Sequence, residues 1–247
     1  LDLRKVTSGA AAAAAALSRD GHQNATLAIM TTDPFPKEAA VRVETPAGVF
    51  HVGGMTKGSG MIEPMMATML GFLTCDAHVE PALLKQALSA AVRDTFNAIT
   101  VDGECSTNDT VFAMASGDSG VVIDDLLYPA LEAGLRAVSK ELAIAIVRGG
   151  EGATKLVAVR VKGAVEWAHA ERAARTIANS LLVKTAVHGG DPNWGRLVAA
   201  AGRSGVPFDL SRAAVRIGGI VLFENGQPHD SNAGQAAAHL SGRDIDI

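Results

Sequence analysis

The chain has 247 residues, 48% of them hydrophobic and 19% charged, which is enough to bury a sizeable core in one large or two small domains. The formal net charge of −4 argues against a nucleic-acid partner, because proteins that bind the phosphate backbone usually carry a basic excess. The two cysteines are too few for a disulfide framework, and the longest apolar run (10–17) is too short to span a bilayer. No signal peptide is recognisable, so we expect a cytoplasmic protein without a membrane partner.

Helical and strand-like patterns both occur, and together they predict the α/β (α+β) class. The alanine-rich stretch Ala10–Ser18 predicts a helix. The apolar stretch Ala25–Met30 predicts a buried strand, which delivers Thr31 at its end. Valines on either side of a Pro-Ala-Gly turn predict a hairpin over residues 41–52.

A glycine-rich loop follows the hairpin and leads to Thr68, at the head of the apolar run 69–75. Taken alone, a threonine at this place is ordinary strand chemistry. A phosphate-binding P-loop is excluded, because Lys57 precedes its glycine and serine instead of following the glycine. The small Ala67 leaves another interpretation open, since cleavage of the Ala67–Thr68 bond would put a nucleophilic hydroxyl and a basic amine on one residue.

The remaining chain continues the mixed pattern. Its predicted elements are a helix that begins at Glu80-Pro81 and carries an apolar stripe as far as Phe96, a strand Val111–Ala115, a helix Pro129–Val147 ended by Gly149-Gly150, a strand Leu156–Val161, a third helix over 170–181 and a final hairpin over 215–223.

Several polar residues in this part have an ordinary explanation when each is taken alone. The Ser-Thr-Asn-Asp-Thr string at 106–110 is typical of turns, and Glu151 between two glycines is typical of a surface turn. Lys57 is typical of a solvated loop lysine. Trp194 indicates a packing anchor. His188 has no other histidine at ligand spacing, so no metal site is assigned.

The glycine loop and its continuation resemble a known motif. Lys57-Gly58-Ser59-Gly60-Met61-Ile62, Pro64 and Met66-Ala67-Thr68-Met69-Leu70 are similar to the self-cleavage motif of the ornithine acetyltransferase (glutamate N-acetyltransferase) family of arginine biosynthesis. Further matches are Thr31-Thr32-Asp33, the string at 106–110, Gly150–Lys155 and Asp191–Arg196. The resemblance extends from Thr31 to about Phe223 and implies layered sheets flanked by helices, in an N-terminal-nucleophile-like arrangement.

The resemblance also implies the chemistry. The precursor would cut itself between Ala67 and Thr68 into an α-chain part, 1–67, and a β-chain part, 68–247, which stay packed together and assemble as α2β2. Thr68 would take the acetyl group of N-acetylornithine and pass it to glutamate, with Glu151 as acid or base. Thr31 and Lys57 would hold the substrates. No cofactor is implied, although acetyl-CoA is an alternative acetyl donor in bifunctional members.

Two departures from the family pattern stand out. Gly149 replaces an aspartate that many members have before their Gly-Glu-Gly. The family's oxyanion-hole Thr-Gly pair and its C-terminal Asn and Ser or Thr fall outside these residues. Two other functions therefore stay open: a related N-terminal-threonine aminopeptidase or amidohydrolase, in which water replaces the amine acceptor, and an inactive amino-acid-binding relative.

Overall fold

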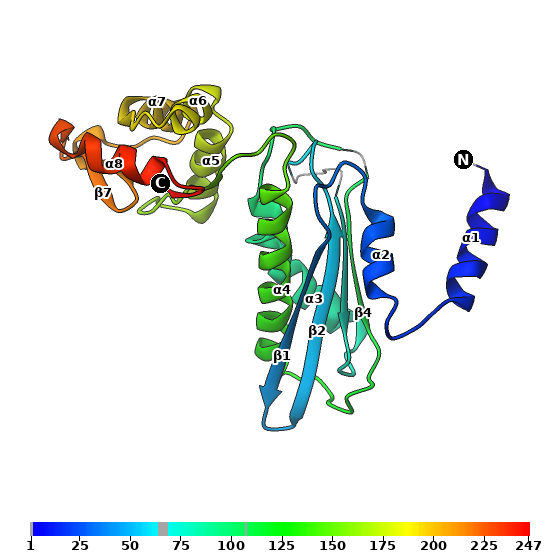
Figure 1. The fold of residues 1–247 in the computed structure, drawn as a ribbon. Helices are drawn as coiled ribbons and strands as arrows, with labels where there is room; N and C mark the ends of the chain where they lie inside the picture. The colour runs from blue at the N-terminus through cyan, green and yellow to red at the C-terminus, as the bar shows by residue number, and fades with distance from the viewer. Residues whose placement is uncertain (1, 64–68, 107) are drawn as a thin grey trace.

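A computed structural model describes residues 2–63, 69–106 and 108–247, so Ala67, Thr68 and the predicted cleavage bond lie outside the described residues. The N-terminal helix α1 (Leu3–Ala15) begins where the Asp2 side chain accepts a hydrogen bond from the Arg4 N–H, and none of its residues is buried. The predicted helix is therefore confirmed, but it begins and ends earlier than the alanine run. Figure 1 shows α1 set apart from the sheet.

The predicted strand Ala25–Met30 is wrong, because residues 25–29 belong to helix α2 (His22–Ile29) and Met30 is its C-cap. The Thr26 hydroxyl donates to the His22 carbonyl one turn earlier, at 2.8 Å, and Thr26 is the buried residue of the helix. A short apolar run does not distinguish a buried strand from a helix by periodicity alone. Here the alanines and leucine, which favour helix, and contact of Thr26 with the sheet decide the outcome.

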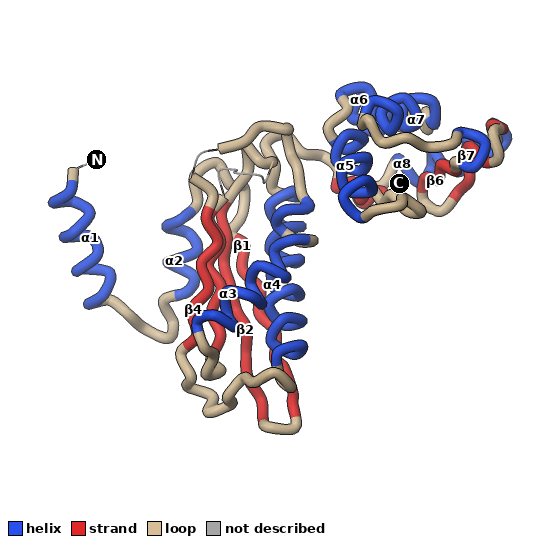
Figure 2. The backbone as a smooth tube through the Cα atoms, turned by 180° about the vertical axis from the view of Figure 1, so that it is seen from behind, coloured by secondary structure: helices blue, strands red, loops and turns tan. Residues whose placement is uncertain are grey.

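The first lobe is built on a four-stranded sheet of order β1-β2-β3-β4, formed by β1 (Lys37–Thr45), β2 (Gly48–Lys57), β3 (Leu70–Cys75) and β4 (Thr110–Ala115). The pairs β1–β2 and β2–β3 are antiparallel and β3–β4 is parallel, so the predicted hairpin and the strand at 111–115 are confirmed. Helices α3 (Pro81–Arg93) and α4 (Tyr128–Arg148) cover one face of the sheet, and α2 covers part of the other (Figure 2).

The core of the first lobe lies between α4 and the hairpin. The predicted apolar stripe of α4 is buried throughout: Leu131, Leu135, Val138, Leu142 and Ile146. Gly134 allows the close approach, because a Cβ atom there would lie 3.1 Å from side-chain atoms of Val43 and Val52. Phe96, predicted within the α3 stripe, is buried in a separate short 3-10 helix, η1 (Phe96–Ala98).

The second lobe has its own core, formed mainly by helices. It contains α5 (Trp167–Ala178), α6 (Leu181–Gly189), α7 (Trp194–Arg203), α8 (Ala233–Leu240), the parallel pair β5 (Leu156–Ala158) and β9 (Asp244–Asp246), the antiparallel strands β6 (Ala214–Ile217), β7 (Ile220–Glu224) and β8 (Gln227–Pro228), and the short 3-10 helices η2 (Leu210–Arg212) and η3 (Asp230–Asn232). The predicted strand at 156–161 is thus shorter, and the predicted helix over 170–181 ends at Ala178. A new helix begins at Leu181, because Ser180 accepts a hydrogen bond from the Val183 N–H as an N-cap.

Trp194 stacks on Phe223 with ring centroids 4.7 Å apart, so its prediction as a packing anchor is confirmed. No helix within residues 2–63, 69–106 and 108–247 is both long enough and apolar enough to cross a membrane. The predicted α/β class is confirmed.

Candidate functional site

The candidate site lies at the end of the sheet where β2 passes into the glycine loop and β3 begins. Lys57, the last residue of β2, pairs with Leu70 at the start of β3, and Leu70 pairs with Thr110 at the start of β4. Paired residues on neighbouring strands lie side by side. Three strands therefore bring Lys57, the head of β3 and Thr110, the last residue of the polar string, to one end of the sheet.

Asp33 joins the Thr31 segment to the glycine loop. One carboxylate oxygen accepts from the Gly58 N–H at 2.7 Å and from the Lys37 ammonium at 2.5 Å, and the other accepts from the Thr31 N–H at 3.1 Å. Burial opposes ionisation, but the hydrogen bonds from Lys37, Gly58 and Thr31 outweigh it and hold the pKa of Asp33 below its ordinary value. Asp33 thus remains a carboxylate, with the exposed side chain of Thr31 beside it.

Lys37 is the partner that makes this burial possible. The side chains of Lys37 and Asp33 are both 0% exposed. A buried ion pair with well-placed hydrogen bonds is tolerated, whereas either charge alone would not be. Sequence reasoning missed this pair. Its only signal is an aspartate four residues before a lysine, and Pro34 and Pro36 rule out the helix in which that spacing usually brings charges together.

Glu151 contacts the same glycine loop. Its N–H donates to the Ser59 carbonyl at 3.2 Å, and the Ser59 hydroxyl donates to the Gly149 carbonyl at 2.6 Å. The carboxyl group of Glu151 lies directly over Gly60, since a Cβ atom at Gly60 would be 2.8 Å from its Cδ and 2.9 Å from its Oε1. Gly60 therefore leaves space for a carboxylate that is itself exposed to solvent.

Asp102 fixes the far side of the loop. Its carboxylate accepts from the Met61 N–H at 2.6 Å and from the Ile62 N–H at 3.0 Å. Met61 has φ of 59°, a conformation that a side-chain-bearing residue adopts at a cost unless neighbouring contacts fix it. The two hydrogen bonds that Asp102 accepts supply that constraint and fix the path of the loop towards Glu63.

Asp109, within the polar string, fixes the head of β3. Its Oδ1 accepts from the Met69 N–H at 2.7 Å, and its buried Oδ2 has no partner among the described residues. Burial raises the pKa of Asp109, although the bond from Met69 and the charge of Lys57 act in the opposite direction. This contact ties Asp109 to the residue that directly follows Thr68 in the chain, so Asp109 positions the head of β3.

The structure thus brings Thr31, Lys57 and Glu151 around one loop, while Ala67 and Thr68 lie outside the described residues. The arrangement offers an ammonium group for a substrate carboxylate and a carboxylate for proton transfer at an amine. Beside the head of β3, a cleft of about 730 Å³ lies between α3, β4 and α5 and is large enough for a small molecule. Among the described residues, no group of three or more His, Cys, Asp or Glu could hold a metal ion.

Comparison with known proteins gives one consistent result. The model of the ArgJ family matches residues 1–247. The "Arginine biosynthesis bifunctional protein ArgJ" of Parasynechococcus marenigrum (strain WH8102) is 49% identical over 247 residues, which is all of this chain and 60% of that protein. The protein of the same name from Thermosynechococcus vestitus is 48% identical over 97% of this chain and 58% of its own length.

A solved structure shows the same fold. The crystal structure of the arginine biosynthesis bifunctional protein argJ from Bacillus halodurans matches with a TM-score of 0.69 and 39% sequence identity, covering 72% of this chain and 87% of that one. The predicted layered arrangement of sheets and helices is therefore confirmed. This chain spans about three fifths of the length of the curated relatives named above.

Proposed function

We propose that the protein moves an acetyl group from N-acetylornithine to glutamate through an ester on Thr68. The chain belongs to the ArgJ family, which supports this proposal. The observation that carries the proposal is the convergence of Lys57, Glu151 and the backbone of Thr31 on one glycine loop. Lys57 directly precedes this loop, Glu151 contacts it, and a buried carboxylate joins the Thr31 N–H to it. In the sequence the loop leads to Thr68, and β3 begins at Leu70.

The first step creates the nucleophile. The precursor cuts the Ala67–Thr68 bond, which frees an α-amine whose reference pKa is about 7.7–8.0. Near neutral pH a fraction of this amine is unprotonated and takes the hydroxyl proton of Thr68. The hydrogen-bonded ladder between β2 and β3 supports the expectation that the pieces 1–67 and 68–247 remain together, because one strand comes from each piece. Assembly as α2β2 is the proposed state.

Two half-reactions follow. The Thr68 oxygen forms a bond to the acetyl carbonyl carbon, and its hydroxyl proton passes through the α-amine to Glu151. The C–N bond of N-acetylornithine then breaks, and ornithine leaves with that proton. The unprotonated amine of glutamate then attacks the ester carbonyl carbon, and the bond from that carbon to the Thr68 oxygen breaks. The amine proton passes through Glu151 and the α-amine to the Thr68 oxygen, which regenerates the hydroxyl and releases N-acetylglutamate. Lys57 and Thr31 hold substrate groups common to both halves. Nothing in this sequence of steps requires an organic cofactor.

Acetyl-CoA is the alternative donor, and the relatives named above are described as bifunctional. Formation of N-acetylglutamate from acetyl-CoA and glutamate, with N-acetylornithine absent, would assign this second activity. The proposed setting is the cytoplasm, where the free cysteines Cys75 and Cys105 would stay reduced.

The experiment that tests the proposal is intact-mass measurement under denaturing conditions. We expect two fragments, one ending at Ala67 and one beginning at Thr68, and Thr68→Ala should leave a single chain. A Thr68→Ala protein that is still cut at this bond would remove Thr68 as the nucleophile. An uncut wild-type chain would favour the inactive amino-acid-binding relative.

A further inference from the structure

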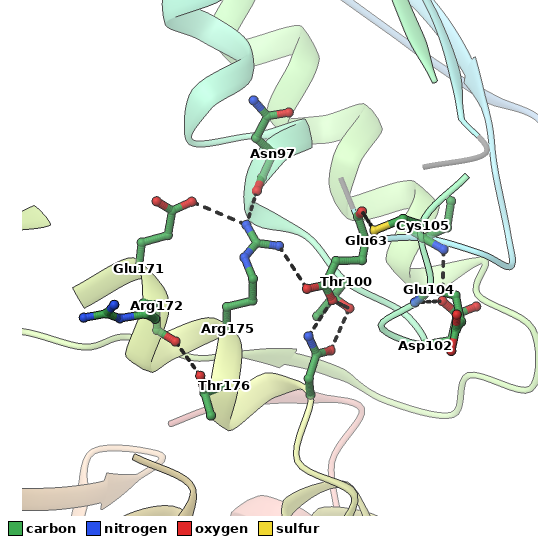
Figure 3. Close-up of polar contacts among 12 residues, drawn as sticks. Glu63, Asn97, Thr100, Asp102, Glu104, Cys105, Glu171, Arg172, Arg175 and Thr176 are labelled. Atoms are coloured by element: carbon green, nitrogen blue, oxygen red, sulfur yellow. Dashed lines mark hydrogen bonds and ion pairs between the residues drawn. The ribbon is translucent and has the colours of Figure 1, made fainter. Parts of the chain in front are cut away.

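Glu63 forms a polar junction between the two lobes, directly before residues 64–68. Its Oε2 accepts from the Thr100 hydroxyl at 2.8 Å and from the Asn179 side-chain amide at 2.5 Å, and its Oε1 lies 3.8 Å from the Arg175 guanidinium. Figure 3 shows Arg175 and Thr100 pointing towards this carboxylate. The Glu63 side chain is only 13% exposed, so these donors replace its water.

The donors from the second lobe belong to the C-terminal end of α5. Arg175 lies in the last turn of the helix and Asn179 is its C-cap. A carboxylate near a helix C-terminus is disfavoured by the partial negative charge there. The contact of Glu63 with α5 is therefore maintained by the side chains of Arg175 and Asn179. Arg175 in turn donates to the Asn97 carbonyl at 2.5 Å and pairs with Glu171 at 3.4 Å, which fixes the guanidinium between the lobes (Figure 3).

The backbone around Glu63 is fixed as well. Besides the hydrogen bonds that the Met61 and Ile62 N–H groups donate to Asp102, the Ile62 carbonyl accepts from the Val101 N–H at 2.7 Å, and the Glu63 carbonyl accepts from the Cys105 thiol at 3.3 Å. At the other end of residues 64–68, Asp109 holds the Met69 N–H. Carboxylates thus fix the chain on both sides of the predicted cleavage bond.

Self-cleavage depends strongly on such positioning. In the proposed reaction the Thr68 hydroxyl oxygen bonds to the Ala67 carbonyl carbon, the peptide C–N bond breaks, and the amine takes the hydroxyl proton. Water then hydrolyses the ester and leaves a carboxylate on Ala67. A misplacement of about 1 Å in an intramolecular attack of this kind costs roughly 10²-fold in rate.

We propose that Glu63 is a positioning residue for this self-cleavage, and that its contacts with Asn179 and Arg175 make cleavage depend on docking of the second lobe. The inference rests on the proposed function, because it presupposes the cut at Ala67–Thr68. Glu63 acts through the chain path and touches no reacting atom. In this account a chain whose α5 is not yet in place cuts itself slowly.

The test is the rate of self-cleavage after synthesis in a cell-free system, followed by denaturing mass measurement. Glu63→Ala should slow cleavage on the order of tenfold, because part of the alignment is lost. Glu63→Gln should recover most of the rate, since its amide oxygen can still accept from Asn179 and Thr100. Glu141→Gln, an exposed residue on α4, is the matched control and should cleave at the wild-type rate.

A second arm separates positioning from general loss of stability. Asn179→Ala should slow cleavage as Glu63→Ala does, and the double variant should be no slower than either one, because residues acting through one contact are not additive. If Glu63→Ala does not fold, Thr100→Val decides, because it keeps the side-chain shape and removes a hydroxyl that lies 2.8 Å from both Glu63 Oε2 and Asn179 Oδ1. It should also slow cleavage. Wild-type rates in the folded variants would overturn the role of Glu63. Failure of the wild type to cleave would instead overturn the proposed function.

Discussion

The buried pair of Lys37 and Asp33 gives the most quantitative prediction. Lys37→Met removes the ammonium and keeps much of the side-chain volume, so the main effect is an uncompensated carboxylate at Asp33. Both side chains are 0% exposed, and breaking a buried pair from one side typically costs about 3–5 kcal/mol of unfolding free energy. For a chain of this size, that corresponds to a fall in Tm of roughly 6–20 °C near pH 7.

The pH dependence of stability should change sign. In the wild type the pKa of Asp33 is lowered by folding, so its contribution to stability is present above the unfolded value of about 3.9 and is lost as pH falls through the folded value. Without Lys37, burial dominates and raises the pKa of Asp33. The loss of unfolding free energy in the variant should therefore be smallest at acidic pH. It should grow as pH rises, because Asp33 must then ionise without a partner.

The assay is thermal unfolding by circular dichroism at pH 7 and pH 4, in a Thr68→Ala background that prevents cutting. Lys140→Met, an exposed lysine on α4, is the control and should melt like the background protein. Adding Asp33→Asn to Lys37→Met should restore much of the loss, since a neutral buried pair carries no unpaired charge. A Lys37→Met protein within about 1 kcal/mol of its background at pH 7 would refute the reasoning.

Three further predictions concern the site. Glu151→Gln should lower the acetyl-transfer rate by about 10²–10⁴-fold with an unchanged circular dichroism spectrum. Near-normal turnover would show that Glu151 is an ordinary surface-turn residue without a catalytic role. Lys57→Ala should raise KM for both N-acetylornithine and glutamate, and an effect on neither substrate would remove Lys57 as a carboxylate ligand. Asp109→Ala should leave the Met69 N–H without its acceptor and slow self-cleavage on the order of tenfold, measured by fragment appearance, whereas Asp109→Asn, which keeps an acceptor, should be milder.

Much of the first lobe could be predicted because its patterns are strong. The apolar stripe of α4 extends from Leu131 to Ile146 and the helix ends at glycines, and apolar residues of β1 and β2 flank a recognisable turn. The prediction for the stretch 25–30 is wrong because a short, mostly apolar run fits a buried strand and a helix equally well. The division between α5 and α6 was missed because the Ser180 cap gives only a weak signal inside an otherwise continuous helical pattern.

The site was predictable only in part. Thr31, Lys57 and Glu151 could be identified because they lie in recognisable strings, and the structure adds their shared glycine loop. Asp33 and Asp109 lie in the same strings, but their contacts with Gly58 and Met69 span 25 and 40 positions in the sequence. The contacts of Asp102 with Ile62 and of Glu63 with Asn179 span 40 and 116 positions. No local pattern shows which distant group a loop carboxylate will accept a hydrogen bond from, so these contacts could not be predicted.

The central claim is the acetyl ester on Thr68, and one measurement tests it most directly. The protein is incubated with N-acetylornithine alone, and the fragment that begins at Thr68 is weighed before and after glutamate is added. We predict one acetyl group on that fragment, discharged by glutamate with release of N-acetylglutamate. If acetyl is lost to water as fast without glutamate as with it, the transferase account is contradicted and the related hydrolase takes its place.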